Sequence, residues 1–333
     1  GALSDSGKLD HTLFYFREIV GDVPSNYRTE DEAQALRIKE LKDRIHKLTG
    51  GRIQYYTLTW KENGFSGIAE FADMLSFDLQ KLLLPEWEQY DRMTPFDREL
   101  YTHESYLREK GKMFRGRTEL VGQLLSDIRN GRKLMILKGE VGSGKSTLFS
   151  HLATQLRRED WEVFPLFSGL TAECVTAFDI LKHMVYYLEK ELNLPHFDGE
   201  TPMDLEQAPI GNEWKEKKTT DQPDYIKQWQ LRLNSLCNQY QTLGKGLIFM
   251  LDAADQLYDD DARDHLIFLP EALSDRIRFI MTCLPELSVS GYTTTSIPAI
   301  REDDKRQVID GILSSHGREL PQEVITRMIA LPA

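Results

Sequence analysis

A glycine-rich segment directly after an apolar run constrains the fold of this chain more than any other feature. The segment LMILKGEVGSGKSTLF, residues 134–149, carries Gly139, Gly144, Lys145 and Ser146 in the spacing G-x-x-x-x-G-K-[ST]. That spacing is typical of a loop between a buried strand and a helix, in which backbone N–H groups and a lysine surround phosphate groups. The sequence therefore predicts a strand, a phosphate-binding loop and a helix in this order.

Segments with strand character alternate with segments of helical periodicity on both sides of the loop. Before it, HTLFYFREIV and RIQYYTLTW are rich in aromatic and β-branched residues, and each precedes an amphipathic helical stretch. The second of these stretches, GIAEFADMLSFDLQKLLL, is expected to end before Pro85. After the loop come the strand-like segments WEVFPLFSG, KGLIFMLDAADQL and RIRFIMTCL, with helical stretches between the first two. This alternation indicates an α/β fold with a parallel, doubly wound sheet.

Composition and charge argue against several classes of protein. The 333 residues include 41% hydrophobic and 28% charged residues, and the formal net charge of -12 gives no general attraction to phosphate backbones or anionic membranes. No apolar run approaches the roughly 20 residues of a membrane span. The three cysteines show no disulfide or metal-binding spacing, which suits a reducing compartment. We expect a cytoplasmic protein, with the nucleus as a second location, that binds neither membranes nor nucleic acid directly.

The loop supplies most of the candidate nucleotide-binding residues. They are Gly139, Glu140, Val141, Gly142, Ser143, Gly144, Lys145, Ser146 and Thr147. Glycines allow the backbone to approach phosphate oxygens with left-handed dihedral angles. Lys145, also a candidate catalytic residue, would neutralise the β- and γ-phosphates, and Ser146 would place its hydroxyl on Mg²⁺. The alternative is a glycine-rich turn that matches the spacing by chance.

A pair of acidic residues follows the apolar run Leu247–Leu251. Because Mg²⁺ keeps several waters and is held by one or two carboxylates, Asp252 at the end of a buried strand is the candidate metal residue. Asp255, three residues later, is the candidate catalytic residue that orients or deprotonates the attacking water. The alternative is that both aspartates only end the strand as turn and cap residues.

Three segments, in their order and spacing, resemble the nucleotide-binding core of the STAND ATPases of the NACHT type: FRGRTEL, GEVGSGKST and LIFMLDAADQL. In that family the first acid of the third segment is typically followed by a small residue and by another acid three positions on, as Asp252, Ala253 and Asp255 are here. LFYFRE, ELKDRI, YYTLTW and FADMLSFDLQKLLLPEW are similar to an α/β segment that precedes the NACHT module in some relatives. The resemblance implies a P-loop NTPase sheet, preceded by a smaller α/β segment and followed by the start of a helical lid.

The resemblance also assigns roles outside the loop. It places Phe114 and Arg117 where relatives close over the adenine and ribose, although a solvated basic turn is the alternative. Thr282 and Cys283 end the strand that usually carries phosphate-sensing residues. Leu284 stands where many relatives have an arginine, which implies slow or absent hydrolysis.

The same resemblance divides the chain into regions. We expect a partial α/β domain at 1–86, a helical connector at 87–113, a NACHT-like NTPase domain at 114–298 with a mobile insertion at 195–223, and the beginning of a lid at 299–333. The chain is then a fragment whose protein partners bind through domains outside it. As such a fragment it is expected to be monomeric.

The function that these features predict is an ATP/ADP-binding, Mg²⁺-dependent regulatory ATPase that acts as a conformational and assembly switch. The alternative is a nucleotide-binding scaffold of a ribonucleoprotein particle, of the vault or telomerase kind, with little or no hydrolysis. A nucleotide kinase or helicase is a weaker rival, since helicase motifs are absent and the chain is acidic.

Overall fold

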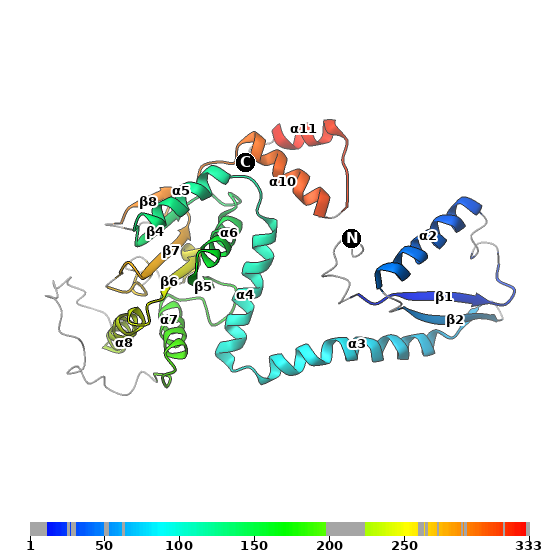
Figure 1. Cartoon of the computed structure of the whole chain (residues 1–333), viewed down its shortest axis with the longest axis horizontal. Helices are drawn as coiled ribbons and strands as arrows, with labels where there is room; N and C mark the ends of the chain where they lie inside the picture. The colour runs from blue at the N-terminus through cyan, green and yellow to red at the C-terminus, as the bar shows by residue number, and fades with distance from the viewer. Residues whose placement is uncertain are drawn as a thin grey trace. The chain divides into compact units, whose positions relative to one another are not determined.

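The computed structural model of this chain contains two compact units, each with its own sheet (Figure 1). It describes residues 12–24, 27, 31–49, 53–61, 64–197, 224–258, 263, 266–271, 273–287, 289, 292–315 and 317–330. The first unit comprises Gly1–Met93 with Ser315–Gly317, and the second comprises Thr94–Ser314 with Arg318–Ala333.

The first unit is a small α/β layer, as the sequence predicts. Its elements are β1 (Tyr15–Val20), α2 (Glu32–Thr49), β2 (Gln54–Lys61), β3 (Gly64–Ser66) and α3 (Ile68–Arg92). β1 runs parallel to β2, and β3 pairs antiparallel with β2. A parallel pair needs a crossover connection, and α2 lies in that connection.

Aromatic side chains fill both faces of this first sheet, because successive residues of a strand point to opposite sides. On one face, the buried Phe16 contacts the rings of His46 in α2 and Tyr55 in β2. On the other face, Tyr56 stacks on Phe71 of α3 with ring centroids 4.1 Å apart. The aromatic run that predicts these strands therefore also supplies the contacts to the helices.

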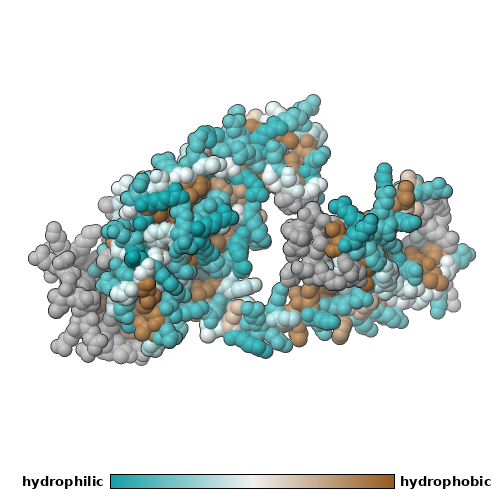
Figure 2. Space-filling view, in the orientation of Figure 1, coloured by the Kyte–Doolittle hydropathy of each residue, from teal (hydrophilic) through white to brown (hydrophobic). Residues whose placement is uncertain are grey.

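α3 is longer than the sequence indicated. The expectation that this helix ends before Pro85 is wrong, because Pro85 lies inside α3. Proline removes one N–H donor, but its φ is close to the helical value, so hydrogen bonding can resume in the next turn. α3 contains no buried residue and exposes Phe77, Leu83 and Trp87, and apolar atoms are visible along it in Figure 2.

The second unit contains a five-stranded sheet in the order β5-β6-β7-β4-β8, and all its pairings are parallel. The strands are β4 (Leu134–Lys138), β5 (Trp161–Phe167), β6 (Gly246–Asp252), β7 (Ile277–Cys283) and β8 (Thr294–Ser296). The first four were predicted from their apolar runs, and the parallel sheet is confirmed. β8 was not predicted, because its three residues are too short to show alternation.

Helices cover both faces of the five-stranded sheet (Figure 1). They are α4 (Pro95–Met113), α5 (Thr118–Arg129), α6 (Lys145–Arg158), α7 (Ala177–Glu191) and α8 (Asp224–Gln241), with the short η4 (Ala254–Gln256) after β6. Residues of β6 alternate between two cores: Phe249 packs with α7 and α8, and its neighbour Ile248 packs with α5 and α6. Among the helices of the described residues, none is long and apolar enough to cross a membrane.

The C-terminal stretch forms two helices, α10 (Glu302–Ser315) and α11 (Gln322–Ala330). The predicted boundary between residues 86 and 87 lies within α3. Of the predicted insertion at 195–223, residues 198–223 lie outside the described part of the chain. The division into regions therefore stays a prediction.

Two glycines test the packing of the second unit. A Cβ at Gly246 in β6 would lie 2.6 Å from the ring of Trp161. Gly246→Ala should therefore lower the free energy of unfolding by about 1–3 kcal/mol through overpacking.

A Cβ at Gly122 in α5 would meet no described atom within 4 Å. Gly122→Ala should raise stability by up to about 1 kcal/mol, because it favours the helix. Urea unfolding measures both, and an undiminished Gly246→Ala stability would contradict the packing argument.

Candidate nucleotide-binding site

The glycine-rich loop lies at the carboxyl end of β4 and leads into the first turn of α6. Gly142 and Gly144 have φ values of 75° and 82°, which side chains other than glycine rarely adopt. The N–H of Gly139 donates to the Cys283 carbonyl at 3.1 Å, so β7 fixes the start of the loop. A Cβ at Gly139 would lie 2.8 Å from the Ser143 hydroxyl, so the loop closes tightly on itself there.

The side chain of Lys145 folds over the loop. Its ammonium donates to the carbonyls of Gly139 at 2.6 Å and Glu140 at 2.9 Å. The outer side of the loop is open to solvent, and Val141 at its tip is 82% exposed. The Ser143 hydroxyl is buried and has no hydrogen-bond partner among the described residues. An anion over this loop would meet an ammonium, backbone N–H groups and the N-terminus of α6.

Asp252 ends β6 and is buried. The Thr282 hydroxyl donates to its carboxylate and accepts the N–H of Ala253 at 3.0 Å. Burial raises the pKa of Asp252 above its usual value, whereas hydrogen bonds to Ser146 and Thr282 and the charge of Lys145 act in the opposite direction. The candidate metal residue therefore lies against the hydroxyl of the candidate metal serine.

Asp255 lies in η4, half-buried, one turn beyond Asp252. Its carboxylate accepts the backbone N–H of Leu284 at 2.9 Å. The preceding Ala253 has a φ of 56°, so the chain turns sharply between the two aspartates. This turn directs both acids to the edge of the sheet at which the loop lies.

The residues at this edge fit a phosphate and a hard cation. Positive charge and N–H donors come from the loop, and carboxylate and hydroxyl oxygens come from Asp252 and Ser146. Such oxygens suit Mg²⁺, which needs only one or two protein ligands when phosphate and water fill the other positions. Among the described residues, no group of three or more histidine, cysteine or acidic side chains could hold a metal by itself.

Phe114 and Arg117, the predicted base-pocket residues, lie at the turn between α4 and α5. Phe114 stacks on His151 of α6 with centroids 4.1 Å apart. Arg117 is buried, with a φ of 54°, and its side chain donates to the Pro298 carbonyl at 3.0 Å. Its backbone N–H donates to Asp304 of α10 at 2.9 Å. Arg117 is therefore not on a solvated turn, and the base-pocket role stays a prediction.

Sequence reasoning missed three partners of these residues. Thr282 was noted only for its place at the end of a strand, yet its hydroxyl orients Asp252. His151 and Asp304 had no marked spacing, because each meets its partner only after the chain folds. A signal for Thr282 was available, since a hydroxyl residue in a buried and mostly apolar strand needs a polar partner.

Two comparisons with known sequences match this chain, one over its middle part and one along nearly all of it. A protein-family model described as Nephrocystin 3, N-terminal, matches residues 122–283. Telomerase protein component 1 from Rattus norvegicus is 21% identical over 354 residues, covering 97% of this chain and 13% of the relative. The chain therefore spans a small share of that curated relative.

Comparison with solved structures gives partial matches of low sequence identity. Cdc6p from Pyrobaculum aerophilum has a TM-score of 0.38 and 15% identity, covering 60% of this chain and 49% of that one. Domain III of the replication initiation protein DnaA from Thermotoga maritima has a TM-score of 0.35 and 14% identity, covering 66% of this chain and 79% of that one.

Asp252→Asn tests the energetic cost of the buried carboxylate. Because burial raises the pKa of Asp252, the folded chain binds this proton more tightly than the unfolded chain. Ionised Asp252 therefore costs stability at neutral pH, and the cost disappears as the pH falls below the folded pKa. We expect Asp252→Asn to resist urea better than the wild type at about pH 7.5, with a smaller difference near pH 4.5.

The matched control is Asp275→Asn, because the Asp275 side chain is 86% exposed. It should show no such trend with pH. Equal stability of the wild type and Asp252→Asn at both pH values would contradict the argument.

Proposed function

We propose that this chain is an ATP/ADP-binding, Mg²⁺-dependent regulatory ATPase of the STAND class, NACHT type, that switches conformation with its bound nucleotide. The observation that carries the proposal is the placement of Lys145, Ser146 and Asp252 at one edge of a parallel sheet. The family-model match at 122–283 spans the loop and both aspartates, which also supports the proposal.

Phosphate binding would fall to the loop and the first turn of α6. Lys145 would exchange the carbonyls of Gly139 and Glu140 for phosphate oxygens, which form stronger, charge-assisted hydrogen bonds. The left-handed Gly142 and Gly144 let the backbone N–H groups face the phosphates. The helix N-terminus adds a favourable dipole.

The metal would be held by the Ser146 hydroxyl and, through water, by Asp252. Bound Mg²⁺ would supply charge neutralisation on the phosphate oxygens. Thr282 keeps the Asp252 carboxylate in one orientation. Burial keeps bulk water away from Asp252, which strengthens its attraction for a cation.

Hydrolysis would depend on Asp255. The Leu284 N–H fixes one carboxylate oxygen of Asp255 and therefore its orientation. A fixed, half-buried carboxylate near the loop can position a water molecule and accept its proton. Leu284 stands where many relatives have an arginine, so little positive charge is available there, and slow turnover is expected.

The switch would use contacts between the nucleotide-binding fold and α10. Asp304 accepts the Arg117 N–H, and the Arg117 guanidinium reaches the Pro298 carbonyl. A Cβ at Gly116 would lie 2.7 Å from Asp304, so the turn and α10 pack closely. A nucleotide that shifts this turn would therefore shift α10, and differential contacts of this kind are what a conformational switch requires.

A second candidate is a nucleotide-binding scaffold of a ribonucleoprotein particle. Similarity to a relative named telomerase protein component 1 along 97% of this chain favours it, as does Leu284 in place of arginine. A scaffold would hold nucleotide without measurable turnover. A steady-state ATPase assay on nucleotide-loaded protein separates the two functions.

Lys145→Ala removes the ammonium proposed to neutralise the terminal phosphates. We expect at least about tenfold weaker binding of ATP and ADP, because charge-assisted hydrogen bonds to phosphate are lost. Calorimetric titration measures it, with Lys133→Ala as the control, since Lys133 is a half-exposed lysine paired with Asp275. Equal affinities in the wild type and Lys145→Ala would eliminate the assignment.

Asp255→Asn tests the catalytic role. Binding of Mg·ATP should be preserved, because Asp255 does not contact the loop lysine, while turnover should fall roughly 100-fold or more. The assay is single-turnover ATP hydrolysis. Asp252→Asn is the comparison, because it should weaken the Mg²⁺ dependence itself. Turnover at the wild-type rate in Asp255→Asn would remove its catalytic role.

A further inference from the structure

Strand β5 is an edge of the five-stranded sheet, and α4 lies against it. The last residue of β5, Phe167, donates its backbone N–H to Nδ1 of His103 in α4 at 3.1 Å. His103 is fully buried, and its ring stacks on the Phe167 ring at an interplanar angle of 12°. A histidine side chain thus takes the place of a neighbouring strand for this N–H group.

This contact fixes the protonation of His103. Nδ1 accepts the Phe167 N–H and therefore carries no proton, so the neutral ring has its proton on Nε2. Nε2 faces Glu99 at 3.3 Å, the distance of a donated hydrogen bond. His103 is consequently a neutral link between a backbone N–H group and a carboxylate.

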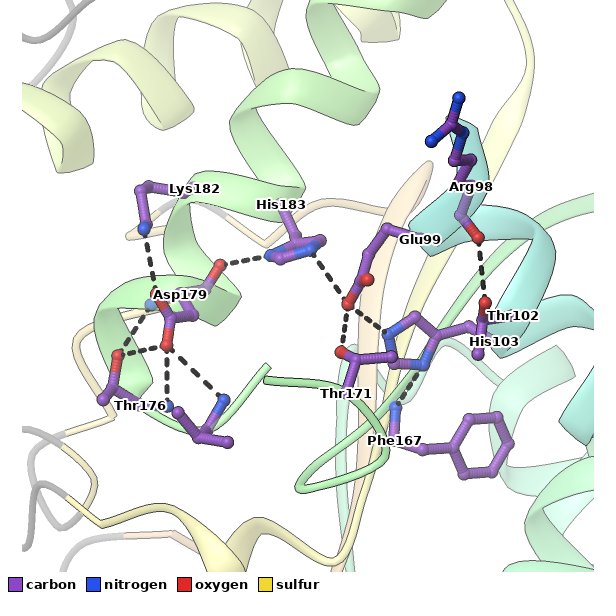
Figure 3. Close-up of polar contacts among 11 residues, drawn as sticks. Arg98, Glu99, Thr102, His103, Phe167, Thr171, Thr176, Asp179, Lys182 and His183 are labelled. Atoms are coloured by element: carbon purple, nitrogen blue, oxygen red, sulfur yellow. Dashed lines mark hydrogen bonds and ion pairs between the residues drawn. The ribbon is translucent and has the colours of Figure 1, made fainter. Parts of the chain in front are cut away.

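Glu99 joins this link to two further elements (Figure 3). The Thr171 hydroxyl, in the segment after β5, donates to the same carboxylate oxygen. His183 of α7 places Nε2 3.6 Å from that oxygen and donates from Nδ1 to the Asp179 carbonyl at 2.7 Å. Side chains from α4, α7 and the loop thus converge on Glu99, and its hydrogen-bond donors are the His103 Nε2–H and the Thr171 hydroxyl.

β5 makes a second polar contact with the helices beside it, and unlike the His103 contact it involves no imidazole. Arg157 of α6 donates to the Val163 carbonyl at 2.8 Å and pairs with Glu104 of α4. Although burial acts to lower the pKa of Arg157, hydrogen bonding to Glu104 raises this pKa above its usual value, so the guanidinium stays charged at physiological pH. α4 is therefore held at the middle of β5 by a pH-independent pair and at the end of β5 by a histidine.

The end of β5 lies next to the candidate site. Phe167 is the register partner of Asp252, and the N–H of Ser168 donates to the Asp252 carbonyl at 3.1 Å. Any loosening of Phe167 would act on the backbone that carries Asp252. The His103 contact is therefore one strand away from the proposed metal residue.

We propose that His103 is a proton-controlled latch, which holds α4 on the end of strand β5 while its Nδ1 is unprotonated and releases the Phe167 N–H when Nδ1 takes up a proton. Protonation would set two N–H donors against each other, so the hydrogen bond must break. Imidazole is the side chain whose charge ordinarily changes between about pH 5 and 8, so the test compares pH values within that range.

Other titratable groups surround His103 and Glu99. Burial tends to raise the pKa of Glu99, but hydrogen bonds from His103, His183 and Thr171 hold it well below its ordinary value. Ionised Glu99 therefore stabilises the fold at pH values above its ordinary pKa, and this stabilisation is lost only as the pH falls below that pKa. Glu99 consequently stays charged in the pH range in which imidazoles ordinarily titrate. Around it lie also the buried Cys174, whose pKa burial raises, and the Asp179–Lys182 pair.

Two substitutions separate the roles of the two ring nitrogens. In His103→Asn, the side-chain oxygen can take the place of Nδ1 and accept the Phe167 N–H, but nothing titrates. In His103→Gln, the amide nitrogen can take the place of Nε2 and donate to Glu99, but the acceptor for Phe167 is lost. The pair thus keeps size and polarity while dividing the two contacts.

The measurement is amide hydrogen exchange of Phe167 at about pH 7.5 and about pH 5.5, corrected for the intrinsic effect of pH. In the wild type, protection of Phe167 should fall by about tenfold at the lower pH, as for one lost buried hydrogen bond. His103→Asn should keep its protection at both pH values, and His103→Gln should lack it at both. Amides of β7 serve as the reference for global stability.

A wild-type protection that does not change relative to β7, or a His103→Asn variant with the same pH dependence as the wild type, would overturn the latch. Should a variant fail to fold, ¹⁵N NMR of the wild-type imidazoles decides. The neutral Nε2–H tautomer of His103 should disappear at the same pH at which Phe167 loses protection. Any other tautomer at about pH 7.5 would overturn the proposal. None of these readouts requires nucleotide, so they are independent of the proposed function.

Discussion

Parallel pairing of β4, β7 and β6 is the constraint on which the candidate site depends. Because parallel strands end at the same edge of a sheet, the pairing brings Gly139, Thr282 and Asp252 together although they are far apart in the sequence. The hydrogen bond from Gly139 to the Cys283 carbonyl then joins the loop directly to that edge. A change in strand order would leave each motif intact and separate the motifs from one another.

Charge at this edge is balanced against burial. Asp252 is almost fully buried, which disfavours its ionised form, yet a hydroxyl from β7, a hydroxyl from α6 and the Lys145 ammonium all compensate for lost water. In the proposed metal role this balance would have to stay incomplete, because a fully satisfied carboxylate would have little affinity for a cation. Stability and ligand binding would then make opposite demands on the same side chain.

Sequence patterns predict the features that depend on neighbouring residues. They do not predict contacts between segments that are distant in the sequence. The loop and its flanking strand and helix could be predicted because spacing and apolar runs are local properties. The Thr282–Asp252 contact spans 30 residues and the Arg117–Asp304 contact spans 187, and both require knowledge of strand order and of the position of α10. Pro85 misled for a different reason: a proline inside a helix removes one hydrogen bond and crowds one carbonyl, yet α3 continues through it.

Two chemically different side-chain contacts satisfy backbone groups of the edge strand β5. An edge strand exposes N–H and C=O groups that would otherwise pair with another chain. Val163 offers a carbonyl, which a permanent donor such as Arg157 satisfies at any physiological pH. Phe167 offers an N–H, which needs an acceptor that α4 can carry into a fully buried position, and a neutral imidazole meets that need at lower cost than a carboxylate. In the proposed latch, the choice of histidine lets a proton break this contact, which lies opposite Asp252.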